Sequence, residues 1–218
     1  WIGYTGPWMY TTNWTATTAG TYGVPNNGTY ATADFPATLA NAFTCTLNQN
    51  VSVKYAKFDA PNMNLVLDNA TLTITDRANP SRYLAYELGA GDTASASIEF
   101  RGASAGIVNS KSSGLARFGV EESATDKVRC TVRFIVPATG WENTAPIRAT
   151  GGDSSVYFWY DTKLVIDATA LGVPAENEVK TVLLATATDG MYNLAKTEIT
   201  CADGAKGSIA VVGNKLVL

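Results

Sequence analysis

The sequence predicts an all-β fold, with a parallel β-helix, or β-solenoid, as the leading architecture and a β-sandwich or jelly roll as the alternative. Apolar and polar residues alternate along many short stretches, as in strands that bury one face. The longest stretch places apolar side chains on one side at Val128, Cys130, Val132, Phe134 and Val136. Asn, Asp, Gly and Pro separate these stretches, as turns require. Apolar residues at helical spacing are nearly absent. The segment that comes nearest to a helix is 33–43, which is interrupted by Pro36 and is expected to hold one short turn.

The spacing of the stretches favours the β-helix. Within residues 51–74, two strand pairs are separated by tight turns at 59–62 and 68–70, which is the pattern of one coil of a parallel β-helix. The apparent repeat is about 20 residues and irregular. The long strand at 128–136 suits a sandwich as well, so both architectures stay open. Residues 90–113, rich in Gly, Ala and Ser, predict a loop around one strand.

The length of 218 residues suits a single β domain spanning residues 1–218. Residues 1–43 are expected to form an aromatic-rich N-terminal cap that covers the open end of the β stack. Its aromatic residues are Trp1, Tyr4, Trp8, Tyr10 and Trp14. Residues 138–153, which contain several Gly and Pro, mark a candidate joint or a long loop within the domain.

The charge content is low, at 16% against roughly 25% for an ordinary domain. The net charge of −3 and the absence of a basic cluster exclude a nucleic-acid partner. No apolar run reaches the roughly 18 residues of a membrane-spanning helix, so membrane insertion is not expected. This composition is typical of exported bacterial proteins and predicts an extracellular or cell-surface location.

The chain has no histidine, which removes catalytic triads and the usual zinc and iron ligands. The segment Gly102-Ala-Ser-Ala-Gly106 has the letters of a nucleophile elbow without the following helix or a later histidine. We therefore expect no enzyme activity, no catalytic residue, no metal and no cofactor. Glycosidase chemistry remains an alternative, because it requires two carboxylates and no histidine. The candidates are Glu87, Asp92, Glu99, Glu121, Glu122, Asp153 and Asp161.

The three cysteines, Cys45, Cys130 and Cys201, each lie in or just after a strand-like stretch. We favour small buried core residues over one disulfide with a leftover thiol. The aspartates beside glycines, at 153, 189 and 203, indicate turns rather than a calcium site.

Aromatic residues give the strongest indication of binding. In residues 156–160, alternation places Tyr157 and Trp159 on one face and Phe158 and Tyr160 on the other. Aromatic side chains combine apolar area with polar groups, which suits glycans and protein interfaces. The predicted binding residues are Tyr157, Trp159, Tyr160 and Trp141. A strand buried on both sides is the alternative.

Short motifs at both ends of the chain carry a resemblance to a known class. They are Gly6-Pro-Trp8, Asn13-Trp14, Gly23-Val-Pro25 and Ala33-Asp-Phe35 near the start, and Ala145-Pro-Ile147, Lys163-Leu-Val-Ile-Asp167, Val182-Leu-Leu184, Asp189-Gly190 and Gly213-Asn-Lys-Leu-Val-Leu218 near the end. In these motifs the chain resembles bacterial surface proteins with autotransporter-type or PEP-CTERM-type β-solenoid repeats. The resemblance implies a parallel β-helix, export and a cell-surface role, and it carries no catalytic residues.

Three functions follow as hypotheses. The first is a non-catalytic extracellular protein, structural or adhesive, that self-assembles through strand edges such as residues 213–218. The second is a carbohydrate-binding module for a cell-surface glycan. The third is a polysaccharide-active enzyme that uses carboxylates.

Overall fold

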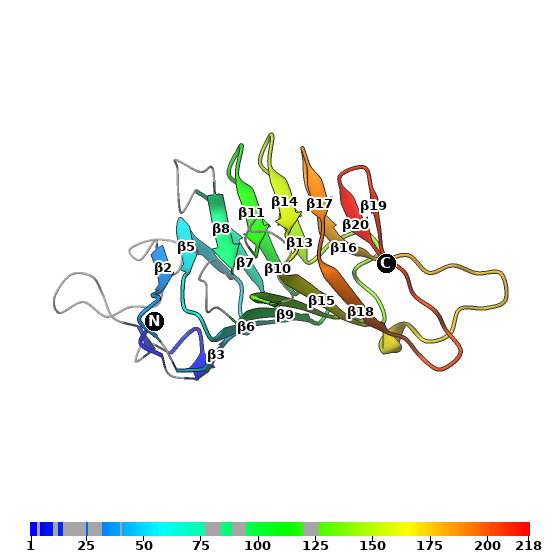
Figure 1. The fold of residues 1–218 in the computed structure, drawn as a ribbon, viewed down its shortest axis with the longest axis horizontal. Coiled ribbons are helices and arrows are strands. Elements are labelled where there is room, and N and C mark those ends of the chain that lie inside the picture. Colours follow the sequence, from blue (N-terminus) through cyan, green and yellow to red (C-terminus); the bar gives the residue numbers. More distant parts are fainter. Residues whose placement is uncertain are drawn as a thin grey trace.

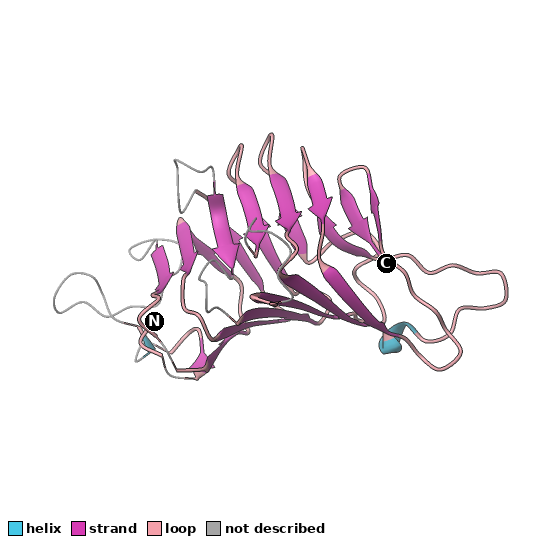
Figure 2. Ribbon diagram, viewed as in Figure 1, coloured by secondary structure: helices cyan, strands magenta, loops and turns pink. Residues whose placement is uncertain are grey.

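The computed structural model describes residues 1–3, 5–10, 13–14, 25, 32–39, 41–76, 84–88, 95–119 and 127–218, apart from the side chains of residues 84 and 85. The described chain is all-β, and its strands form three sheets (Figures 1 and 2). The prediction of an all-β fold is thus confirmed. A short 3₁₀ helix, η3 (Thr169–Leu171), lies beyond the sheets near the C-terminal end.

The strands divide among the sheets in a regular way. The first sheet contains, in spatial order, β1 (Gly6–Pro7), β3 (Phe43–Leu47), β6 (Met63–Asp68), β9 (Ala96–Arg101), β12 (Cys130–Ile135), β15 (Thr162–Asp167) and β18 (Lys196–Thr200). The second contains β4 (Val51–Val53), β7 (Thr71–Ile74), β10 (Gly106–Asn109), β13 (Ile147–Ala149), β16 (Leu183–Thr186), β20 (Lys215–Val217) and β19 (Ala210–Val212). The third contains β2 (Thr32–Phe35), β5 (Tyr55–Phe58), β8 (Leu84–Leu88), β11 (Leu115–Phe118), β14 (Ser155–Phe158) and β17 (Met191–Asn193).

From β3 to β17 the chain visits the first, second and third sheets in turn, and we call each set of three strands a circuit. Neighbouring strands within a sheet belong to successive circuits and run parallel. The exception is the pairing of β20 with β16 and β19, which is antiparallel. Figure 1 shows the strands of each sheet following one another along the long axis of the molecule.

The core consists of side chains that stand in register from circuit to circuit. One row of the first sheet contains Leu65, Ile98, Val132 and Leu164, each at most 1% exposed. The strands that pair with β2, β3 and β4 in the next circuit lie 20–23 residues further along the chain, close to the predicted repeat of about 20: Phe43 pairs with Met63, Val51 with Leu72 and Thr32 with Tyr55. In the later circuits partners in register are 30–40 residues apart. Loops of unequal length between the strands explain why the repeat is irregular in the sequence.

Three tryptophans are buried at the N-terminal end of the sheets. The rings of Trp1, Trp8 and Trp14 lie 5.4–5.7 Å from the ring of Phe35 in β2. The indole N–H of Trp14 also donates a hydrogen bond to the Trp8 carbonyl at 2.7 Å. Residues 33–35, part of the range predicted to hold one helical turn, belong to strand β2. In contrast Tyr10 is 59% exposed, and Tyr4 lies outside the described residues.

Two ranges that were predicted from the sequence to be a loop or a joint contain strands. Residues 90–113 contain two strands, β9 and β10, and not one. The candidate joint at 138–153 contains β13, which pairs with β10 on one side and β16 on the other. The second sheet therefore passes through this range without a break.

At the C-terminal end of the sheets, the strands that lie at the edge differ from the strand predicted from the sequence. The expected pairing edge at 213–218 contains β20, which is already bonded to β16 and β19 on its two sides. In the described part of the chain β17, β18 and β19 are the last strands of their sheets.

None of the three cysteines forms a disulfide. Cys45 and Cys130 are completely buried in the first sheet, which confirms them as small core residues, and Cys201 is half-buried. No helix among the described residues has the length and apolarity required to cross a membrane.

Candidate functional site

The outward-facing side chains of the third sheet form a continuous row, which we call the outer row. Glu87, Arg117, Tyr157 and Tyr192 are in register on β8, β11, β14 and β17. The Arg117 guanidinium forms an ion pair with the Glu87 carboxylate, and each side chain is only about 15% exposed. The first two positions of the row therefore carry opposite charges that neutralise each other, and the last two positions are aromatic.

The aromatic end of the row consists of stacked rings. The ring centroids of Tyr157 and Tyr192 are 4.3 Å apart with an interplanar angle of 20°. The Trp159 ring lies 5.5 Å from that of Tyr157 at 35°. We call Tyr157, Trp159 and Tyr192 the aromatic surface. Aromatic pairs at these separations stabilise one another beyond the area they bury.

Tyr192 is the most accessible member of this surface, with 51% of its area exposed. It lies on β17, the last strand of the third sheet, so no further described strand stacks on the ring. Gly190 makes room for it, because a Cβ there would lie 2.7 Å from Cε2 of Tyr192. A larger residue at 190 would displace the ring.

A hollow of about 220 Å³ adjoins the aromatic surface. Its lining residues come from two successive circuits and are Ser113, Gly114, Leu115, Asp153, Ser155 and Tyr157. The Ser155 hydroxyl donates a hydrogen bond to the Asp189 carboxylate at 3.2 Å. The hollow thus combines hydroxyl and carboxylate groups with one aromatic wall, and none of its six lining residues is basic.

The structure brings together two of the four predicted binding residues. Tyr157 and Trp159 are in contact, as alternation predicted. Tyr160 is 46% exposed, and it does not share the inward face of Phe158, because β14 ends at residue 158. Trp141 is only 1% exposed and packs edge-on against Phe134 in the core, so it is not part of the aromatic surface.

Tyr192 was missed by sequence reasoning. It comes from the next circuit and meets Tyr157 only through the parallel pairing of β14 with β17. The signal in the sequence is weak: a tyrosine two residues after the turn at Asp189-Gly190, in a stretch of only three strand residues.

Three of the seven candidate catalytic carboxylates form ion pairs with arginines. Glu87 pairs with Arg117 on the third sheet, and Glu99 lies 3.8 Å from Arg101 on the first. Asp161 is buried and its carboxylate lies 3.8 Å from Nε of Arg129. Asp153 borders the hollow, while Asp92, Glu121 and Glu122 lie outside the described residues.

The described residues contain no cluster of three or more His, Cys, Asp or Glu side chains placed to hold a metal ion. The segment Gly102-Ala-Ser-Ala-Gly106 is the turn between β9 and β10, so a strand and not a helix follows its serine. The motif therefore lacks the geometry of a nucleophile elbow.

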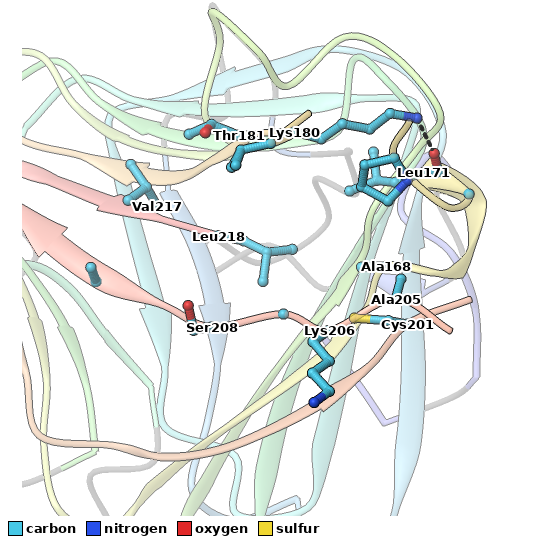
Figure 3. A pocket seen from close by; sticks show the side chains of 15 residues that line it. Ala168, Leu171, Lys180, Thr181, Cys201, Ala205, Lys206, Ser208, Val217 and Leu218 are labelled. Carbon is cyan, nitrogen blue, oxygen red and sulfur yellow. Dashed lines mark hydrogen bonds between the residues drawn. The ribbon is translucent and has the colours of Figure 1, made fainter. Parts of the chain in front are cut away.

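A second pocket, of about 270 Å³, lies at the C-terminal end between η3 and the last strands (Figure 3). Ala168, Leu171 and Leu218 contribute apolar walls, and Cys201 borders it. The Lys180 ammonium donates a hydrogen bond to the Leu171 carbonyl at 2.5 Å, which ties the loop after η3 to that helix. This pocket is separate from the aromatic surface, with which it shares no lining residue.

Comparisons with protein-family models, curated proteins and solved structures found no match to this chain.

Proposed function

We propose that the chain is a non-catalytic, adhesive extracellular surface protein, built as a three-sided parallel β-helix that presents the aromatic surface to a partner. The strand order through three sheets, the parallel pairing and the inward rows in register support the β-helix. The low charge content and the resemblance to bacterial surface proteins support the location.

The observation that carries the adhesive role is the stacked Tyr157–Tyr192 pair on the outside of the third sheet. Fully buried aromatic side chains serve packing, whereas the aromatic surface, with Tyr192 exposed and Tyr157 and Trp159 half-buried, offers apolar area to a partner. Tyr192 exposes half of its area, and its stacking partner Tyr157 lines the polar hollow. The neutralised Glu87–Arg117 pair next to it leaves the aromatic rings as the main feature of this face.

The test is the adsorption of fluorescently labelled protein to intact bacterial cells, measured by flow cytometry. We expect the Tyr192→Ala variant to lose most of the cell-bound signal. Tyr10→Ala is the matched control, because Tyr10 is equally exposed but lies at the other end of the molecule. Absence of binding by the unmodified protein, or equal loss in both variants, would contradict the adhesive role.

Self-assembly through strand edges is a second candidate, favoured by the outer edge of β19, on which no described strand pairs. Its three residues are all exposed, with Val212 59% exposed, and an unpaired edge of this kind can recruit another strand. Light scattering after size exclusion should show oligomers that Val212→Lys dissociates, because a charged edge resists pairing. A monomer at every concentration would contradict it.

A further inference from the structure

We infer that the aromatic surface and its hollow bind a neutral glycan, an uncharged chain of sugar rings. This inference rests on the adhesive role proposed above and adds the chemical class of the ligand. Sugar rings have apolar faces of C–H groups and a rim of hydroxyls. A site for them therefore needs an accessible aromatic face with hydrogen-bonding groups at its edge.

The stacking element is Tyr192. One face of its ring packs on Tyr157, and no described strand follows β17 to stack on the row. The Tyr157–Trp159 contact extends the aromatic area along the chain, just past the end of β14. The ring centroids are 4.3 and 5.5 Å apart, so the surface extends over more than one ring, which favours a chain over a monosaccharide.

The hydrogen-bonding element is the hollow. Asp153, held in a turn with a φ of 54°, and the hydroxyl-bearing Ser113 and Ser155 border it next to Tyr157. The carboxylate of Asp153 accepts hydrogen bonds from sugar hydroxyls, and charge-assisted bonds of this kind are stronger than neutral ones. The volume of about 220 Å³ is below the roughly 300 Å³ of pockets for drug-sized ligands, so it suits one sugar unit while the rest of the chain lies on the rings.

The charges of the site argue for a neutral ligand. Asp153 lies in the hollow and Asp189 accepts the hydrogen bond of Ser155 at its edge, whereas none of the lining residues is basic. Arg117, the nearest cation in the outer row, is 14% exposed and paired with Glu87. A uronate or sialic acid would therefore meet like charge, with no compensating cation among the six described lining residues.

The test is isothermal titration of the intact chain with cellohexaose and mannohexaose as neutral probes and with oligogalacturonate as the acidic probe. We expect at least one neutral probe to bind and the acidic probe to bind at least tenfold more weakly. Tyr192→Ala should weaken neutral binding by about tenfold, while Tyr192→Phe, which keeps the ring, and the control Tyr10→Ala should retain it. Far-ultraviolet circular dichroism verifies that each variant folds.

A further variant tests whether the Asp153 carboxylate, and not the shape of the hollow, disfavours the acidic probe. Asp153→Asn should narrow the difference between neutral and acidic probes, because it removes the repelling carboxylate. Preferential binding of the acidic probe would overturn the inference and leave the adhesive role intact, provided that Tyr192→Ala still abolishes cell adsorption. If no probe binds while adsorption still requires Tyr192, the glycan class is wrong. If adsorption is also independent of Tyr192, the proposed function fails as well.

Discussion

Tyr157 and Tyr192 occupy the same position on neighbouring parallel strands, one circuit apart, and their rings stack with centroids 4.3 Å apart. The pair is at once a cross-strand contact of the third sheet and the centre of the proposed adhesive surface. Its contribution to stability can therefore be measured separately from its contribution to binding.

We expect the two tyrosines to be energetically coupled. A double-mutant cycle with Tyr157→Ala and Tyr192→Ala, measured by urea unfolding, should give a coupling free energy of about 0.5–1 kcal/mol, as for other cross-strand aromatic pairs. Strictly additive effects of the two substitutions would show that the rings do not stabilise each other.

The buried pair Arg129–Asp161 should matter far more than the exposed pair Arg101–Asp68. The Asp161 side chain is 3% exposed, and its removal leaves a buried arginine without this partner, which costs about 3–5 kcal/mol. The Asp68 side chain is 36% exposed, so Asp68→Ala should cost less than about 1 kcal/mol although its ion pair is shorter, at 3.1 Å against 3.8 Å. Chemical unfolding of Asp161→Ala and Asp68→Ala compares them, and equal losses would contradict the role of burial.

The tryptophans at the N-terminal end should be a major source of stability. Trp8 is completely buried, and its indole N–H donates a hydrogen bond to the Pro25 carbonyl at 3.1 Å. Trp8→Ala is expected to lower the free energy of unfolding by about 3–5 kcal/mol. The control Tyr10→Ala, at an exposed position, should change it by less than about 0.5 kcal/mol. A small loss for Trp8→Ala would mean that this end of the stack does not depend on its aromatic cover.

Alkaline pH should destabilise the fold through two thiols. Burial raises the pKa of Cys45 and of Cys130, whereas both ionise near about 8.5 in the unfolded chain. Since only the unfolded state then releases these protons, stability is complete below that pH and falls above it. Each thiol contributes up to about 1.4 kcal/mol per pH unit.

This pH effect is measured by urea unfolding between pH 8 and 9.5. Below that window the N-terminal amine of Trp1, whose pKa is lowered by desolvation, acts with the opposite sign. Above it, Tyr86 adds to the decline, because burial raises its pKa as well. The double variant Cys45→Ala, Cys130→Ala should show a flatter profile in the window. An unchanged slope would assign the effect to other groups.

The sequence by itself determined the strands and the direction of their side chains. Alternation is a local property, because successive residues of a strand point to opposite sides whatever the strand pairs with. It therefore placed Val132 and Phe134 inward correctly. Residues 159 and 160 lie beyond β14, where alternation no longer fixes the face. Trp159 still contacts Tyr157, whereas Tyr160 is 46% exposed and does not share the buried face of Phe158.

Only the tertiary structure decided which strands became neighbours. Parallel pairing joins residues from different circuits, and loops of unequal length hide that register in the sequence. This choice of neighbouring strands determines three features that the sequence did not show. Tyr157 stacks on Tyr192, Trp141 is buried against Phe134, and β20 is paired on both sides. An aromatic side chain suits a core and a binding surface equally well, so its role depends on what the neighbouring circuit places beside it.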